Sequence, residues 1–218
     1  MTMYRAICLS IDSLVDSKLE HILFNVAVPL ILVIKNKTQF SIARSMLKEK
    51  LEELSSKHPS FYYSLEALST VLDIDYNLLL DLYEYLAYNY VSRVDYAEEL
   101  LRVLRSKNIR SIVYTKSDSS IEEIKLSAVG IRTYVDLLIS LPELFGVVRG
   151  SDVFRKLANH VVKQGHASNA KEILVVSPNL EDYLDAREAG LNVIWFSKHG
   201  EVRTRNQIFS LRELLDLI

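Results

Sequence analysis

Residues Val176 to Gly190 read VSPNLEDYLDAREAG and carry the clearest pattern in the chain. The stretch begins at the end of a short apolar run, Ile173–Val176, whose β-branched residues favour a buried strand. A helix is predicted over Leu180–Glu188, and Gly190 suits its C-terminal cap because glycine adopts a positive φ without strain. The stretch therefore predicts one strand-to-helix unit of an α/β fold.

The same unit recurs along the chain. Three further apolar runs predict buried strands, and three amphipathic segments predict helices that pack on them. The strands are Tyr4–Ile11, Ser111–Tyr114 and Asn192–Phe196, and the helices are Tyr96–Lys107, Ser119–Ala128 and Ser210–Ile218. Strands that are apolar on both faces indicate a parallel sheet covered by helices. We therefore predict an α/β fold with a three-layer, Rossmann-like parallel sheet core.

The stretch between the first two strands breaks this order. Residues 17–94 hold helix-like runs, such as Ser45–Ser55 and the tyrosine-rich Leu78–Tyr90, and show no strand alternation. We predict a mostly α-helical cap at 17–94, inserted into a core of 1–16 and 95–218. The apolar run Ile22–Ile34 is shorter than the ~20 residues that cross a bilayer. It is expected to be buried in the cap or at a subunit contact.

Composition narrows the setting of the protein. The 218 residues are 49% hydrophobic and 25% charged, with a formal net charge of -2. No charge excess points to a nucleic-acid or membrane-surface partner. The single cysteine, Cys8, lies in an apolar run, which predicts a packed thiol and a reducing, cytoplasmic setting. The first apolar stretch is short and is broken by Ser10 and Asp12, which argues against a signal peptide.

The order of motifs resembles the haloacid dehalogenase-like (HAD) superfamily, in its phosphoglycolate-phosphatase-like branch with a helical cap. Leu9–Ser17 (LSIDSLVDS) resembles the FDLDGTLVDS of that family with one residue deleted. The resemblance implies that Ser10 replaces the nucleophilic, metal-binding Asp, and that Asp12 matches the general acid and base. An alcohol brings no charge to Mg²⁺ and needs an adjacent base in order to attack. The alternative is that both residues only cap the strand and the next helix.

Two more motifs of the resemblance concern phosphate. Thr115 is similar to the phosphate-binding hydroxyl of the family, and amides at the start of the Ser119–Ala128 helix are expected to assist it. Phe145–Asp152 (FGVVRGSD) resembles GVxKPDP, which puts Arg149 at or next to the lysine position. Arginine retains the charge and could clamp a phosphate or a carboxylate. The alternatives are a solvated surface arginine at this position and Lys156 as a weaker substitute.

The fourth motif concerns the metal. VSPNLEDYLDAREAG resembles VGDSxxDxxAAxxAG, so that Pro178 replaces the first Asp and Asp182 matches the second. The resemblance implies Mg²⁺, for which Asp182 is the one matching side-chain ligand, together with the Asp12 carbonyl. Because Mg²⁺ prefers near-octahedral oxygen ligands with one or two carboxylates, we expect a weak site at most. Rescue by Glu181 would require a rearranged loop.

Three hypotheses about function follow. The first is a HAD-like protein with a degenerate active site, which lacks efficient phosphohydrolase activity and binds a small phosphorylated molecule or a protein partner. The second is a Mg²⁺-dependent hydrolase of a small phosphorylated metabolite, with Ser10 activated by Asp12, or with Asp12 or Asp16 as a displaced nucleophile. The third is compatible with either and is a homodimer formed through Ile22–Ile34 or the tyrosine-rich segment.

Overall fold

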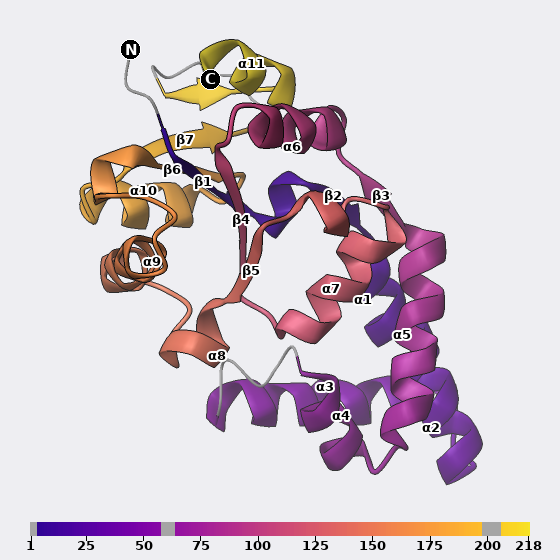
Figure 1. Cartoon of the computed structure of the whole chain (residues 1–218). Helices are drawn as coiled ribbons and strands as arrows, with labels where there is room; N and C mark the ends of the chain where they lie inside the picture. The colour runs from indigo at the N-terminus through magenta and orange to yellow at the C-terminus, as the bar shows by residue number, and fades with distance from the viewer. Residues whose placement is uncertain (1–3, 58–63, 198–205) are drawn as a thin grey trace. The chain divides into compact units, whose positions relative to one another are not determined.

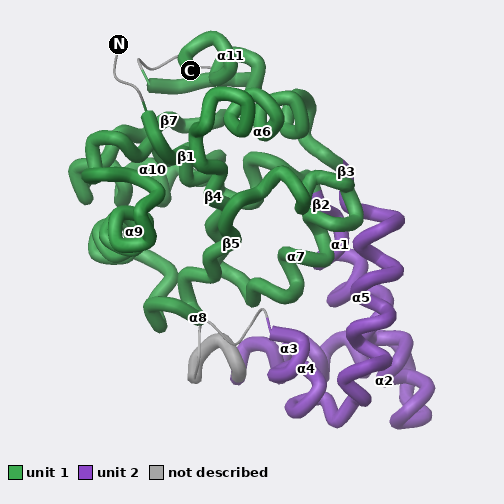
Figure 2. The backbone as a smooth tube through the Cα atoms, viewed as in Figure 1, with its two compact units in different colours: residues 1–16, 93–218 green, residues 17–92 purple. Residues whose placement is uncertain are grey.

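The computed structural model describes residues 4–57, 64–197 and 206–218. It forms two compact units, which Figure 2 colours separately. The core unit contains Met1–Asp16 and Arg93–Ile218, and the insertion unit is Ser17–Ser92. The sequence analysis put the insertion at 17–94. Two short strands, β2 (Val15–Ser17) and β3 (Val91–Arg93), pair where the chain passes from one unit to the other.

A parallel sheet of six strands, in the order β5-β4-β1-β6-β7-β8, forms the centre of the core unit (Figure 1). The strands are β1 (Ala6–Ser10), β4 (Arg110–Thr115), β5 (Leu137–Ser140), β6 (Ile173–Ser177), β7 (Asn192–Phe196) and β8 (Gln207–Ile208). The four predicted strands are confirmed, while β5 and β8 were missed. β5 was missed because its apolar run continues into a helix without a break, and β8 has only two residues. Burial raises the pKa of the Cys8 thiol, on β1, to about 12.

Helices cover both faces of this sheet. Figure 1 shows α9 and α10 at the left of the sheet and α7 at its right. The helices are α6 (Ala97–Ser106), α7 (Ser119–Ala128), α8 (Leu141–Phe145), α9 (Ser151–Lys163), α10 (Leu180–Glu188) and α11 (Leu211–Leu217), with short 3-10 turns at η1 (Ile11–Ser13), η4 (Arg132–Tyr134) and η5 (Ala170–Glu172). The three-layer α/β architecture predicted from the sequence is therefore confirmed.

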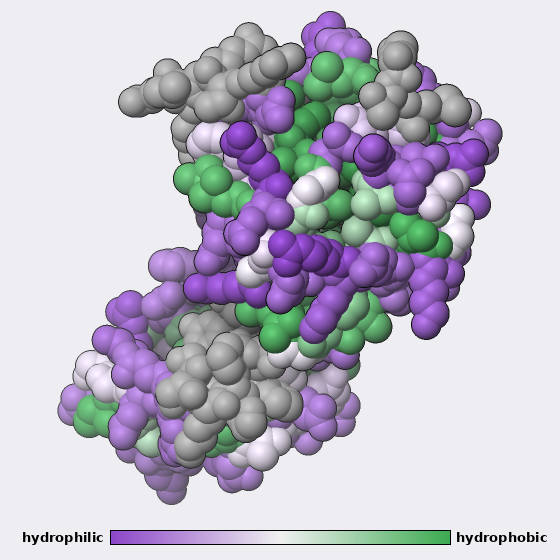
Figure 3. All heavy atoms as spheres, turned by 90° about the vertical axis from the view of Figure 1, so that its left-hand side faces the viewer, coloured by the Kyte–Doolittle hydropathy of each residue, from purple (hydrophilic) through white to green (hydrophobic). Residues whose placement is uncertain are grey.

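Local sequence explains where these helices begin. The side chains of Asp118, Asn179 and Ser210 accept hydrogen bonds from backbone amides of α7, α10 and α11. Such N-caps satisfy amides that have no partner within the helix. On α9, Val153, Leu157 and Val161 recur every fourth residue and pack into one cluster with the sheet. Figure 3 shows this side of the core unit, where hydrophilic residues surround smaller hydrophobic patches.

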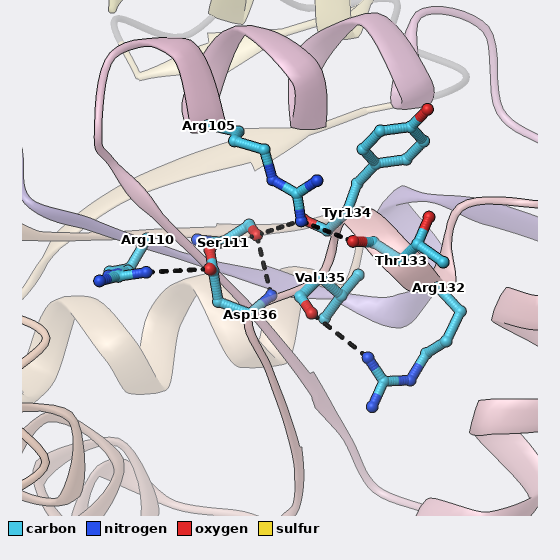
Figure 4. Close-up of polar contacts among 8 residues, drawn as sticks. All are labelled: Arg105, Arg110, Ser111, Arg132, Thr133, Tyr134, Val135 and Asp136. Carbon is cyan, nitrogen blue, oxygen red and sulfur yellow. Dashed lines mark hydrogen bonds and ion pairs between the residues drawn. The ribbon is translucent and has the colours of Figure 1, made fainter.

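A carboxylate fixes the start of β5 against β4. Asp136 Oδ2 accepts hydrogen bonds from the backbone N–H of Ser111 at 2.8 Å and from its hydroxyl at 2.9 Å. Asp136 Oδ1 accepts one from Arg110 at 3.1 Å (Figure 4). Partial burial acts to raise the pKa of Asp136, but the hydrogen bonds from Ser111 and Arg110 outweigh it, and the pKa is lowered. The ionised carboxylate therefore stabilises this corner of the sheet.

The insertion unit is helical, as predicted. Its elements are α1 (Leu19–Ile22), the π-helix η2 (Leu23–Ala27), α2 (Val28–Asn36), α3 (Phe40–Lys57), α4 (Leu65–Leu72) and α5 (Tyr76–Tyr90). Ser64 and Asp75 cap α4 and α5 through their side chains. A Lys35–Asp73 ion pair of 2.5 Å links α2 to the C-terminal end of α4.

The first helical run of the insertion unit is buried on one side and exposed on the other. It continues from Leu19 to Asn36, which is 18 residues with a hydropathy of 1.5, and 28% of it is buried. By length and composition it could cross a membrane, which is weak evidence because core helices and signal sequences share these properties. The run was expected to be buried in the cap or at a subunit contact, and one of its sides is buried in the cap. Leu19, Leu23 and Leu32 pack inside, whereas Val26, Leu30 and Ile34 recur every fourth residue and stay exposed.

Replacing Asp136 by Asn should lower the free energy of unfolding by about 1–2 kcal/mol at neutral pH, because the charged acceptor of three hydrogen bonds is lost. Since the folded pKa of Asp136 is lowered, its contribution is present above the ordinary carboxyl pKa of about 4 and is lost as the pH falls below it. Urea unfolding of Asp136→Asn and of the native chain from about pH 3 to about pH 7, on both sides of the carboxyl titration, checks both points. The exposed Asp95→Asn is the matched control, and equal stability of the two variants would contradict the account.

Candidate functional site

The carboxyl ends of β1, β4 and β6 bring three hydroxyls to one end of the sheet. In the parallel register Ser10 faces Tyr114, and Leu9 faces Val176, so Ser10 lies between Tyr114 and Ser177. Side chains alternate along a strand, and Ser10 follows Ala6 and Cys8 on the face that α9 and α10 cover. The three hydroxyls therefore point to the same side of the sheet.

Asp182, in the first turn of α10, is the acidic residue of this cluster. It is 2% exposed. Its Oδ2 accepts hydrogen bonds from the Tyr114 hydroxyl at 3.1 Å and from the Ser177 hydroxyl at 3.0 Å. Its Oδ1 forms an ion pair with Lys116 Nζ at 2.5 Å. The carboxylate thus has a cation on one oxygen and two neutral donors on the other.

Electrostatics explain why these partners are needed. A buried carboxylate is costly unless it is paired and hydrogen-bonded, and removing the partner of a buried ion pair costs about 3–5 kcal/mol. Burial, first of all, and then the nearby charge of Asp182 raise the pKa of Tyr114 well above its usual value. Tyr114 therefore stays protonated and serves as a donor. We call Asp182, Lys116, Tyr114 and Ser177 the Asp182 cluster.

Thr115, the predicted phosphate ligand, has partners within the chain. Its hydroxyl donates to Glu122 Oε1 at 3.4 Å and accepts from the Ser117 N–H at 3.0 Å. Glu122 is itself buried and pairs with the buried Lys125 at 3.2 Å. In the structure Glu122 turns towards β4 and holds the Thr115 side chain.

The start of α7 is also occupied, which corrects the expectation that its amides are available for phosphate. The Ser119 N–H and hydroxyl donate to the two oxygens of Glu143, each at 2.7 Å. The Ser120 N–H donates to Asp118 Oδ1 at 3.0 Å. Carboxylates of the chain therefore fill the place at a helix N-terminus where an anion would bind.

The remaining predicted residues are not drawn into the Asp182 cluster. Asp12 is exposed in η1. The Arg149 side chain is 72% exposed and forms an ion pair with Glu181 at 3.7 Å. Lys156 is exposed on α9. The roles of Asp12 in catalysis and of Arg149 in phosphate binding stay predictions.

The sequence analysis missed Lys116 and the role of Tyr114. A usable signal was present, because Lys116 directly follows a buried strand end, and parallel neighbours bring such ends together. Pro178 stands where the family has its first acid of the fourth motif, and its carbonyl accepts a hydrogen bond from Trp195 Nε1 at 3.1 Å. Over residues 4–57, 64–197 and 206–218, no group of three or more His, Cys, Asp or Glu could hold a metal ion.

Replacing Tyr114 by Phe should lower the free energy of unfolding by about 1–3 kcal/mol, because a buried carboxylate loses a donor. Because the folded pKa of Tyr114 is raised, its contribution persists at neutral pH and is lost as the pH rises above about 10. Ultraviolet titration should show one late-ionising tyrosine fewer in Tyr114→Phe. The control Tyr85→Phe removes an exposed hydroxyl, and a Tyr114→Phe protein as stable as this control would refute the role of Tyr114.

No family model matches the chain. The chain is similar to the pyrimidine 5'-nucleotidase YjjG of Escherichia coli (strain K12), with 28% identity over 128 residues, which are 56% of this chain and 55% of that protein. The chain thus spans about half the length of the curated relative that it matches.

Solved structures match over nearly the whole chain. The HAD phosphatase from Thermococcus onnurineus has a TM-score of 0.74 at 19% identity, covering 97% of this chain and 96% of that one. The 2-haloacid dehalogenase from Pseudomonas syringae pv. Tomato DC3000 has a TM-score of 0.69 at 16% identity, covering 99% and 98%. A predicted phosphoglycolate phosphatase from Haemophilus somnus has a TM-score of 0.67 at 14% identity, covering 100% and 99%. The chain has the haloacid dehalogenase-like fold.

Proposed function

We propose that this chain binds a small phosphorylated molecule or a protein partner and has lost efficient phosphohydrolase chemistry. The observation that carries the proposal is the Asp182 cluster. Asp182 is the one acidic residue left at the positions that the resemblance assigns to the metal, and its carboxylate is buried and bound by Lys116, Tyr114 and Ser177. These contacts engage both oxygens of the carboxylate, which supports the proposal that Asp182 does not act as a metal ligand.

The nucleophile position supports the same conclusion. Ser10 is 5% exposed, and the hydroxyl of a serine attacks only when a neighbouring base removes its proton. Asp12, the nearest acid along the chain, is exposed in η1, whereas the Ser10 side chain is buried. The resemblance therefore replaces the attacking carboxylate of the family by an alcohol.

The surroundings of Thr115 support the loss of the phosphate site. The Thr115 hydroxyl is bound to Glu122, and the first amides of α7 are bound to Glu143 and Asp118. Glu122 is neutralised by Lys125, but the carboxylates of Asp118 and Glu143 at the start of α7 repel a phosphate dianion, since like charges at short range are unfavourable. A ligand of this chain would have to use other groups, of which Arg149 is the exposed cation next to α10.

Charge, cysteine burial and exposed apolar residues bear on the partners, the cellular location and the oligomeric state of the protein. A net charge of -2 favours neither nucleic acid nor an anionic membrane surface as a partner, and the single buried cysteine agrees with a cytoplasmic protein. The exposed residues Val26, Leu30 and Ile34 are consistent with a homodimer contact on the insertion unit. We propose that the chain forms a homodimer through this contact.

A second candidate function is a Mg²⁺-dependent phosphatase of a small phosphorylated metabolite. The similarity to a pyrimidine 5'-nucleotidase over 128 residues favours it, and a nucleoside monophosphate would then be the substrate class. Asp12 or Asp16, both exposed, would act as the displaced nucleophile. In this case Mg²⁺ would have to bind away from the paired oxygens of Asp182.

Hydrolysis of p-nitrophenyl phosphate and of a pyrimidine nucleoside monophosphate, with and without Mg²⁺, separates the two candidates. The proposal expects kcat/KM to be lower by about 10⁴ or more than for the E. coli nucleotidase measured in parallel, because the nucleophile and a metal ligand each contribute several kcal/mol to transition-state stabilisation. Robust Mg²⁺-dependent turnover that disappears in Asp12→Ala would establish the second candidate instead. A matched Asp95→Ala variant controls for the loss of an exposed carboxylate.

A further inference from the structure

The ammonium group of Lys116 lies beside Asp182, at the position where the resemblance implies a metal ion. Lys116 follows the last residue of β4, and its Nζ is 2.5 Å from Asp182 Oδ1. The Lys116 side chain is 26% exposed and that of Asp182 is 3% exposed. An ion pair that is shielded to this degree from water is screened little by salt. The Lys116 charge beside Asp182 is therefore a permanent structural feature of the fold.

Mg²⁺ does not fit the residues around Asp182. The ion requires near-octahedral oxygen ligands and usually one or two carboxylates. The two other positions that the resemblance assigns to acids carry Ser10 and Pro178, and neither has a charged side chain. Both oxygens of Asp182 are already bound, Oδ1 by Lys116 and Oδ2 by two hydroxyls. Adding a divalent cation would place it against the Lys116 ammonium group.

We propose that Lys116 takes the place of the divalent cation and keeps metal ions out of this end of the sheet. A single internal positive charge neutralises the one acid that remains, so the fold is complete without a metal. The inference rests on the proposed function for the assignment of Asp182 to the ligand-binding end of the sheet. The inference predicts whether the protein takes up a metal ion, whereas the proposed function predicts whether it turns over a substrate.

The register of the sheet provides a sharp variant. Ser10 faces Tyr114 in β4, and its side chain lies on the same side of the sheet as the Tyr114 and Ser177 hydroxyls. A carboxylate at position 10 would therefore stand beside the Asp182 cluster and restore a second acid. If Lys116 excludes metals, this second acid alone should pair with the ammonium group, and a metal should enter only when the ammonium group is also removed.

The experiment compares four proteins: the native chain, Ser10→Asp, Lys116→Met and the double variant S10D/K116M. Lys116→Met keeps an unbranched side chain and removes the charge. Binding of Mn²⁺ is measured from the electron paramagnetic resonance signal of the free ion. Thermal unfolding is measured in 10 mM MgCl₂, about ten times a millimolar Kd, against NaCl of equal ionic strength.

The expected result is metal uptake by the double variant alone. Its Tm should rise by roughly 3–6 °C in MgCl₂, while the native chain and Ser10→Asp shift by less than about 1 °C. Lys116→Met should unfold roughly 6–20 °C below the native chain, because it leaves Asp182 buried without its cation. Adding Asp182→Asn to the double variant should abolish Mn²⁺ uptake.

Two results would overturn the inference. One is Mn²⁺ binding by the native chain or by Ser10→Asp, lost in Asp182→Asn, which would show that the ammonium group does not exclude metals. The other is a folded double variant that binds no Mn²⁺, which would show that Lys116 is not what prevents binding. If the double variant does not fold, the native chain and Ser10→Asp still decide. A native chain without metal uptake but with phosphatase activity would uphold the inference and refute the proposed function.

Discussion

The buried carboxylate of Asp182 is the constraint on which the functional end of the core unit depends. A charge in that position must be balanced, and the chain balances it with Lys116 on one oxygen and the hydroxyls of Tyr114 and Ser177 on the other. These partners come from the ends of β4 and β6, so one acid at the start of α10 links the consecutive elements β6 and α10 to β4, which is distant in the sequence. The core unit thus neutralises this buried acid with charges of the chain itself.

Side chains of the chain also satisfy one another's charges and hydrogen bonds on the α7 side of β4. Glu122 and Lys125 form a buried pair that holds Thr115, and Glu143 binds the first residue of α7 through both of its oxygens. Where the resemblance implies a metal ion and a phosphate, the structure has side chains of the same charge as these ligands, the Lys116 ammonium group and the Glu143 carboxylate. An ion pair of this kind is a weak source of stability compared with apolar packing, but breaking it is expensive. The arrangement holds these side chains in fixed positions.

Much of the fold follows from the sequence because it depends on local patterns. Apolar runs such as Ile173–Val176 and helix caps such as Asn179 act within a few residues, and the corresponding elements are confirmed. The charged contacts depend on tertiary structure. Lys116 and Asp182 are far apart in the sequence and meet only because β4, β1 and β6 are parallel neighbours. The same holds for Glu143 at the start of α7. Helix α9 was missed because the residues before it were interpreted only as a motif, although Val153, Leu157 and Val161 have helical spacing.

We infer that a lysine and not a divalent cation neutralises Asp182. A crystal structure of the native chain grown in MnCl₂, with anomalous diffraction recorded to locate the metal, tests this inference. We expect Lys116 Nζ in contact with Asp182 Oδ1 and no anomalous peak beside that carboxylate. An octahedral metal ion bound to Asp182, with the Lys116 side chain turned away, would refute the inference.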